Sequence, residues 1–381
     1  MRALVEMSYR ERILTTLRGE RADRLPFFHY WRHSQRGRVW REVRNRGMGL
    51  GWSRPSYTSS MPHVEIVERR DTSTGEATHF IEYHTPVGVV TERVKQEAGT
   101  GQWHAQRSWR DVSPWVVDRK IRSPEDYDVV RFMVEDTVYR PYYFPIEQAK
   151  EWVGDDGFVI TSTGHTPMQM LMIDWVGSGG GRFYIHHARY REKVEELYEA
   201  LVRKYMEKVE IAADSPADMV LVGDNIDGVL VDPRLFERYF MPVYEECGEV
   251  LHGRGKIMAT HMDGRLGILK DLIAKCPQDV IEALHPPPMG DLPIAEALSL
   301  WGDKVIMMAY PGSVYTMGPG AVKGHLLELL RSVVPGDRLI ICASSENLVS
   351  NENLLMLASV LEDATLPLTK QGIDEIERAL P

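Results

Sequence analysis

The feature that most constrains the fold of this chain is a regular alternation of segments that begins near residue 155. Short apolar runs of strand length alternate there with amphipathic runs of helix length. Such alternation is typical of βαβ units, which form parallel sheets. The candidate strands are 158–162, 219–223, 256–261, 280–284, 304–309 and 338–342.

An earlier apolar and aromatic run, LPFFHYW at 25–31, suits a first buried strand. The chain has 381 residues, more than an average domain, but TIM barrels with insertions reach this length as one folded unit. We therefore predict an α/β fold, a (β/α)8 TIM barrel, that forms a single domain over residues 1–381.

Two additions to the barrel are predicted. Ser8 and Glu11 have capping-box spacing and open an amphipathic stretch that stops at Gly19, which indicates an N-terminal helical segment. Between residues 60 and 120 the pattern changes to alternation, with turn signals at Gly75 and at PVG, residues 86–88. We predict a β-rich insertion near the barrel mouth, which either contributes to the site or is a purely structural cap.

Composition excludes several classes of protein. The net charge is −10 and the one dense basic stretch, 32–46, is interleaved with apolar residues, so we expect no nucleic-acid partner. The sequence has neither an apolar membrane span nor an apolar signal core after MRALVEMSYRER, so we expect no membrane association and a cytoplasmic location. Three scattered cysteines do not indicate a disulfide framework. The oligomeric state stays open, with a homodimer as one alternative.

Polar residues at the ends of the predicted strands are the candidate site residues, because the loops there converge on one pocket in a TIM barrel. They occur in TGHTP, GDNID, THMDG, IEALHPPP, AYPG and ICASSEN. The candidates are His165, Asp224, Asn225, Asp227, His261, Asp263, Glu282, His285, Tyr310, Cys342 and Glu346.

One group among these has the chemistry of a metal site. His261 and Asp263 lie two residues apart at a strand end and can bind one cation together. Cys342 or Glu282 would complete a three-ligand site with an open position, as in catalytic zinc sites. The alternatives are a histidine hydrogen-bonded to its neighbouring aspartate and a cysteine buried as a small hydrophobe. Glu282 itself lies in an apolar run and requires a cation or a buried hydrogen bond nearby.

The remaining candidates also have two interpretations. Asp224, Asn225 and Asp227 could accept a proton, orient a polar substrate or support a metal ligand, or they could serve in turns and helix caps. His285 precedes three prolines and is either a substrate contact or a packed histidine at a strand end.

Several segments, in order along most of the chain, resemble the uroporphyrinogen decarboxylase superfamily. They are RERILTTLRGERADRLP, TGHTP, GDNIDG, DPRLFERYFMPVYEE leading into GKIMATHMDG, MGDLPIAEALSLWGDKVIMMAYPG and ENLLMLASVLED. That superfamily contains cofactor-free tetrapyrrole decarboxylases and zinc methyltransferases that work with corrinoid proteins or thiols. The decarboxylases carry an arginine-rich loop of the RQAGR kind after the first strand, where this chain reads HYWRHSQRGRVW.

The chain is more similar to the methyltransferases, of the methylcobamide to coenzyme M type, which use a His-x-Cys pair and a later cysteine. Here Asp263 replaces the first cysteine. The resemblance implies zinc held by His261, Cys342 and one of Glu282 or Asp263, with a corrinoid protein and a small methylated molecule as partners. His165, Asp224, Asn225 or Tyr310 would orient the substrate or supply a proton, and the predicted substrate-binding residues are His285, Asp227 and Glu346.

Two other functions remain open at this point. One is a metal-free decarboxylase or lyase, in which Asp224 and the arginines near residue 35 bind a carboxylated substrate. The other is a non-catalytic binding homologue that keeps the barrel without the chemistry.

Overall fold

The computed structural model describes residues 6–34, 37–73, 77–95, 115–343 and 349–380. Contacts within the chain divide it into two compact units. The first unit comprises Met1–Tyr57, Pro141–His165 and Val209–Pro381, and the second comprises Thr58–Arg140 and Thr166–Lys208.

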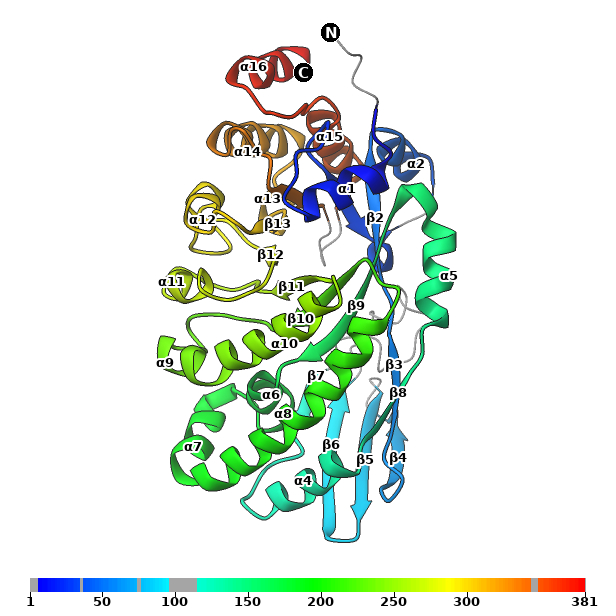
Figure 1. Ribbon diagram of the computed structural model, residues 1–381, viewed down its shortest axis with the longest axis vertical. Coiled ribbons are helices and arrows are strands. Elements are labelled where there is room, and N and C mark those ends of the chain that lie inside the picture. The colour runs from blue at the N-terminus through cyan, green and yellow to red at the C-terminus, as the bar shows by residue number, and fades with distance from the viewer. Residues whose placement is uncertain (1–5, 35–36, 74–76, 96–114, 344–348, 381) are drawn as a thin grey trace. The chain divides into compact units, whose positions relative to one another are not determined.

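The first unit contains a closed barrel of eight parallel strands in the order β1-β14-β13-β12-β11-β10-β9-β2 (Figure 1). This confirms the predicted (β/α)8 TIM barrel. The strands are β1 (Phe27–Tyr30), β2 (Met48–Ser53), β9 (Gly157–His165), β10 (Met219–Gly223), β11 (Ile257–His261), β12 (Val280–Leu284), β13 (Val305–Ala309) and β14 (Leu339–Cys342).

Helices cover the outside of the barrel, as Figure 1 shows for α11, α12 and α14 beside the later strands. Within the described part of the chain, no helix combines the length and the apolar character needed to cross a membrane. The helices of this unit are α1 (Tyr9–Leu17), η1 (Trp31–His33), α2 (Arg38–Asn45), α5 (Phe144–Val153), η3 (Gly154–Asp156), α9 (Pro233–Leu235), η6 (Phe236–Phe240), α10 (Met241–Gly253), α11 (Lys270–Ile273), α12 (Ile294–Leu300), α13 (Gly312–Tyr315), α14 (Pro319–Ser332), α15 (Asn351–Glu362) and α16 (Lys370–Ala379).

Helix α1 begins at the predicted capping box, in which Ser8 and Glu11 each bond the other's backbone N–H. Its apolar side chains join the barrel core, a single cluster that includes the first residues of β10, β12 and β13. The helix thus closes the N-terminal end of the barrel with apolar contacts. The α1 members of this cluster are Tyr9, Ile13 and Leu17.

Strand β2, MGLGWS, was not among the strands predicted from the sequence, because two of its six residues are glycines. The packing explains both glycines. A Cβ atom on Gly49 would lie 1.8 Å from ring atoms of Tyr9, and one on Gly51 would lie 2.9 Å from the ring of Phe28. Glycine is therefore required where α1 and β1 pack closely on this strand.

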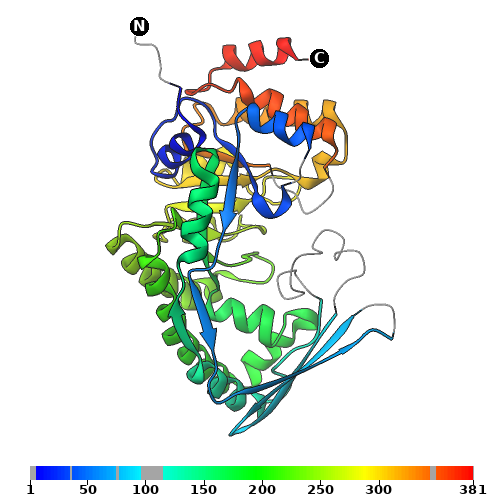
Figure 2. The same ribbon diagram turned by 90° about the vertical axis from the view of Figure 1, so that its right-hand side faces the viewer.

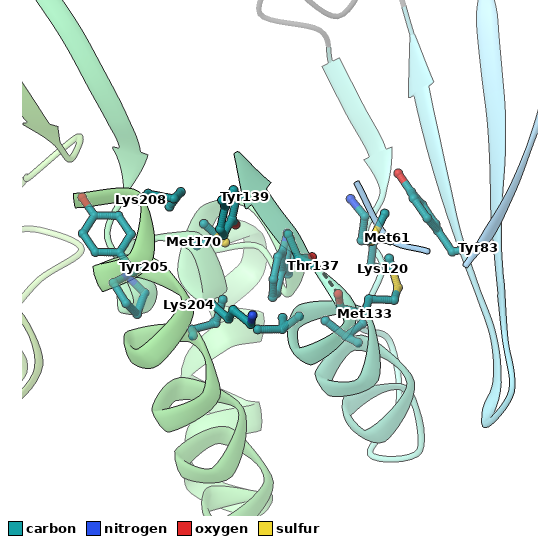
Figure 3. A pocket seen from close by; sticks show the side chains of 15 residues that line it. Met61, Tyr83, Lys120, Met133, Thr137, Tyr139, Met170, Lys204, Tyr205 and Lys208 are labelled. Carbon is teal, nitrogen blue, oxygen red and sulfur yellow. Dashed lines mark hydrogen bonds between the residues drawn. The ribbon is translucent and has the colours of Figure 1, made fainter. Parts of the chain in front are cut away.

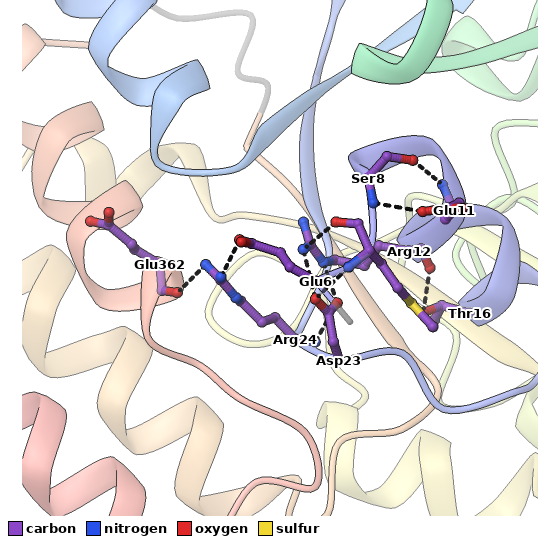
Figure 4. Close-up of polar contacts among 9 residues, drawn as sticks. Glu6, Ser8, Glu11, Arg12, Thr16, Asp23, Arg24 and Glu362 are labelled. Atoms are coloured by element: carbon purple, nitrogen blue, oxygen red, sulfur yellow. Dashed lines mark hydrogen bonds and ion pairs between the residues drawn. The ribbon is translucent and has the colours of Figure 1, made fainter. Parts of the chain in front are cut away.

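The segment that leads into the barrel is held by a polar network (Figure 4). The Arg12 guanidinium donates to Asp23 Oδ1 at 2.6 Å and Oδ2 at 3.0 Å, and to the carbonyl of Met7 at 3.0 Å. Arg24 pairs with Glu6 and donates to the carbonyl of Glu362 at 3.3 Å. Most of these bonds connect α1 and the segments on its two sides, and the bond from Arg24 to Glu362 connects them to α15.

The second unit contains a four-stranded antiparallel sheet in the order β4-β5-β6-β7, whose long strands lie side by side in Figure 2. Strands form within the region of alternation predicted between residues 60 and 120, and Pro86 and Val87 connect β5 to β6 at the predicted turn. The predicted turn at Gly75 lies outside the described residues. The elements that lie wholly or mostly in this unit are β3 (Tyr57–Ser60), which pairs with β8 (Val138–Pro141), β4 (Glu65–Asp71), β5 (Thr78–Thr85), β6 (Gly88–Lys95), β7 (Trp115–Asp118), α4 (Asp126–Asp136), α6 (Pro167–Gln169), η4 (Met170–Trp175), η5 (Gly179–Gly181), α7 (Arg182–Arg189) and α8 (Arg191–Asp214).

A buried ion pair fixes α1 to the sheet. Arg10 donates to both oxygens of Asp218, at 3.0 and 2.5 Å, and Asp218 also accepts the Val159 N–H at 2.8 Å. Burial alone would raise the pKa of Asp218, but the hydrogen bonds from Arg10 and Val159 and the positive charges of Arg10 and Lys150 lower it below its ordinary value. The pair therefore contributes stability only while Asp218 is ionised.

We expect Arg10→Met to lower the free energy of unfolding at neutral pH by about 2 kcal/mol, because it leaves Asp218 buried without its main partner. Since the folded pKa of Asp218 is depressed, the wild-type advantage is present above the unfolded pKa of about 3.9 and is lost as pH falls through the folded value. Chemical denaturation at neutral and acidic pH measures this difference. Arg21→Met, which removes an exposed pair with Asp337, is the matched control and should be neutral. An equal loss in both variants would contradict the prediction.

Candidate functional site

The inward side chains at the C-terminal end of the barrel form the candidate site. Alternate residues of each strand face the barrel interior, and the core cluster of inward residues includes Phe28, Ala259, Val280 and Ile340. Two residues further along the same strands, the inward positions hold Tyr30, His261, Glu282 and Cys342. Since α1 closes the opposite end with apolar contacts, the polar inward residues are concentrated at this end.

Glu282 is the most deeply buried of these four residues, with 2 % of its surface exposed. The Tyr30 hydroxyl donates to its Oε1 at 2.5 Å, and the Nδ1 of His261, in register with Glu282 on the neighbouring strand, forms a short contact with its Oε2. Burial alone would raise the pKa of Glu282, but the charge of His261, the bonds from His261 and Tyr30, and the charge of Arg32 lower it. The partner that a carboxylate in an apolar strand requires is thus His261.

His261 lies between two carboxylates. Its Nδ1 faces Glu282 and its Nε2 lies 3.5 Å from Oδ2 of Asp263. Burial would lower the pKa of His261, but the charges of and hydrogen bonds to these carboxylates raise it to about 10. The same interactions lower the pKa of Asp263 against the effect of its own burial. At neutral pH the group therefore consists of an imidazolium and two carboxylates, which can hold a proton for transfer.

The backbone beside Glu282 is strained. Ala283 has a φ of 64°, in the left-handed region that favours glycine. The pairing of β12 with β13 shifts at the same place, between Glu282 and Leu284. Such bulges re-aim a side chain next to a site, and strain of this kind is concentrated at functional sites.

The spacing of His261 and Asp263 fits a metal ion. Two ligands on one tetrahedral zinc, each about 2.0–2.1 Å from the ion, lie about 3.3 Å apart, and the His261 Nε2 to Asp263 Oδ2 distance is 3.5 Å. Glu282 on the other ring nitrogen matches the carboxylate that orients a metal-bound histidine. Among the described residues, no group of three or more His, Cys, Asp or Glu side chains is placed so that it could hold a metal ion. Cys342, 3 % exposed, lies in the apolar core cluster.

Two more predicted residues are brought together beside this group. Asn225, just after β10, lies 3.4 Å through Nδ2 from Nε2 of His165 at the end of β9. Their neighbour Asp224 is fully buried and accepts a hydrogen bond of 2.9 Å from the hydroxyl of Tyr244 on α10.

The other predicted residues have mainly local contacts. Asp227 accepts the N–H groups of Val229 at 2.7 Å and Arg265 at 3.2 Å, as a turn residue does. His285 Nδ1 contacts the Asp263 carbonyl at 3.2 Å. The hydroxyl of buried Tyr310 donates to the carbonyl of Val322 on α14 at 3.3 Å. Glu346 lies outside the described residues.

Two residues that act on Glu282 were not named individually as candidates in the sequence. Tyr30 binds Glu282 directly, and the charge of Arg32 lowers the pKa of Glu282. Tyr30 is the last residue of β1, so the rule that selected residues at the ends of the later strands would have found it. Arg32 lies two residues after Tyr30, so the same rule for polar residues at strand ends would have selected it.

Comparison with known proteins supports the fold. No protein-family model matches the chain, and no curated protein matches it. Among solved structures, a methyltransferase from Methanosarcina mazei aligns with a TM-score of 0.54 at 12% sequence identity, covering 98% of this chain and 100% of that chain. At this identity the likeness shows a shared fold over nearly the full length of both chains.

We expect Glu282→Gln to lower the pKa of His261 by at least about one unit, because the charge that most opposes the effect of burial is removed. Histidine NMR titration of metal-free protein measures the change, with the His261 signal assigned from His261→Gln. Tyr30→Phe, which removes a hydroxyl but no charge from the same carboxylate, is the control and should change that pKa less. A His261 pKa unaltered by Glu282→Gln would show that the two side chains are not coupled.

Proposed function

We propose that this chain is a zinc-dependent methyltransferase that moves a methyl group between a small O-, N- or S-methylated substrate and a corrinoid carried by a separate protein. The observation that carries the proposal is the His261–Asp263 donor pair at the C-terminal end of the barrel, with Glu282 behind the imidazole. The fold shared with a methyltransferase from Methanosarcina mazei and the motif resemblance noted above support the same reaction class.

In this proposal His261, through Nε2, and Asp263 hold the zinc ion, and Cys342 at the end of β14 is the third donor. A zinc ion bound there would act as a Lewis acid on the heteroatom that carries the methyl group. The sequence left Glu282 open as a zinc ligand, and we propose a different role for it. Its contact with Nδ1 fixes the ring so that Nε2 faces Asp263, which makes Glu282 a positioning residue.

The pair His165 and Asn225 is suited to orienting the substrate or supplying a proton to the departing atom, since they lie at the C-terminal ends of neighbouring strands and contact each other. His285, Asp227 and Glu346 remain the proposed substrate contacts. One carboxylate oxygen of Asp224 accepts a hydrogen bond from Tyr244, and the hydroxyl of Tyr310 donates one to α14. We therefore assign both residues a positioning role.

Metal content tests the first part of the proposal. Protein purified without chelators should contain about one zinc per chain, and His261→Ala and Cys342→Ala should lose it, because each removes a donor. Elemental analysis measures the metal. His252→Ala, which removes a histidine that pairs with Asp279 on the outside of the barrel, should keep the full content. Absence of metal from the wild-type protein, or its retention in His261→Ala, would exclude this zinc site.

Methyl transfer is tested with free cob(I)alamin as the surrogate acceptor and a panel of methylated amines, thioethers and aryl ethers. We expect one class to consume cob(I)alamin, followed by its absorbance, with a rate at least about tenfold lower in His261→Ala. Chelation should abolish the reaction. A zinc-loaded protein that methylates cobalt from none of these compounds would contradict the proposed reaction. Methyl transfer that survives chelation would exclude the Lewis-acid role of zinc.

A further inference from the structure

The second unit contains a cavity of about 210 Å³. All residues that line it belong to that unit, and they come from α4, α8, η4 and the segments around the antiparallel sheet (Figure 3). Most of the lining is apolar and includes Met133, Met170, Trp175 and Leu201. Helix α8 contributes Leu201, Lys204, Tyr205 and Lys208 to the lining. These residues are three and four positions apart, so they lie on one face of the helix.

The charged part of the lining is cationic, and the other polar groups are hydroxyls. Lys120, Lys204 and Lys208 all line the cavity, and among the described residues that line it there is no carboxylate. Lys120 and Lys204 pair with Glu92 at 2.7 Å and Glu207 at 2.9 Å, and both of these glutamates lie outside the lining. An ammonium group has three N–H donors, so a lysine that is paired with one glutamate keeps donors for a second acceptor.

Lys208 is the most deeply buried of the three, with 5 % of its surface exposed. Its ammonium lies 4.4 Å from the ring centre of Tyr205 and 6.0 Å from that of Tyr139, and both rings line the cavity. Such contacts hold an ammonium group by cation–π attraction. A lysine held in this way at the wall of an apolar cavity is suited to binding a single anionic group that is removed from water.

We infer that this cavity binds a small organic carboxylate with an apolar body. A dry cavity of about 150 Å³ holds a molecule the size of benzene, so the volume here admits a ring or a short chain that carries one carboxylate. The lysine and tyrosine groups would bind the carboxylate, while the methionines and Trp175 would contact the apolar body. The site is separate from the barrel residues described above and does not rest on the proposed methyl transfer.

The test uses the full-length protein and three probes: benzoate, phenylacetate and octanoate, each compared with its neutral amide by isothermal titration calorimetry. We expect at least one of the carboxylates to bind, and its amide to bind at least about tenfold more weakly, because the amide lacks the charge that the lysines attract. Lys208→Met and Lys204→Met should each weaken carboxylate binding, the first by at least about tenfold. Two variants are used so that the result does not depend on the folding of one of them.

Matched controls locate the binding. Lys193→Met, on the same helix but outside the lining, should leave the affinity unchanged, as should His261→Ala in the barrel. Circular dichroism verifies that each variant is folded. The inference is overturned if none of the three carboxylates binds, if the amides bind equally well, if folded Lys208→Met and Lys204→Met both keep the wild-type affinity, or if His261→Ala abolishes binding.

Discussion

The carboxylate of Glu282 inside an apolar barrel is the constraint on which the candidate site depends. An ionised carboxylate buried without partners would cost several kcal/mol, so side chains from neighbouring strands must satisfy it. Tyr30 and His261 do so. Because Glu282 holds one nitrogen of His261, the other nitrogen faces Asp263. One buried charge on β12 thus sets the orientation of the imidazole on β11 and the hydroxyl on β1.

The two ends of the barrel have different roles. Tyr9, Ile13 and Leu17 of α1 fill the N-terminal end with apolar contacts, and Arg10 ties the helix to Asp218. These contacts stabilise the closed sheet and leave no room for polar chemistry there. The polar inward residues are therefore collected at the C-terminal ends of the strands, where loops can vary without disturbing the core.

Strands with a clear apolar pattern could be predicted from the sequence. A strand whose residues are determined by tertiary packing could not. The strands from β9 onward were predicted because each contains a mainly apolar run of strand length, although β9 extends to His165 beyond the predicted end at 162. Strand β2 was missed because its glycines, required by the rings of Tyr9 and Phe28, conceal the apolar pattern. At the site, strand ends indicated His261, Asp263 and Glu282. The sequence could not show that Glu282 binds the imidazole, since this depends on the register between β11 and β12.

Charge balance explains how this group could exchange a proton for a metal ion. As an imidazolium between two carboxylates, the side chains of His261, Asp263 and Glu282 carry one net negative charge. A divalent cation that displaces the imidazole proton would bring the group to neutrality. A thiolate from Cys342 would then restore one negative charge. The positive charge of Arg32, which already lowers the pKa of Glu282, would offset part of it. An aspartate beside histidine is also a harder donor than a thiolate, which favours Lewis-acid activation of an oxygen or nitrogen leaving group.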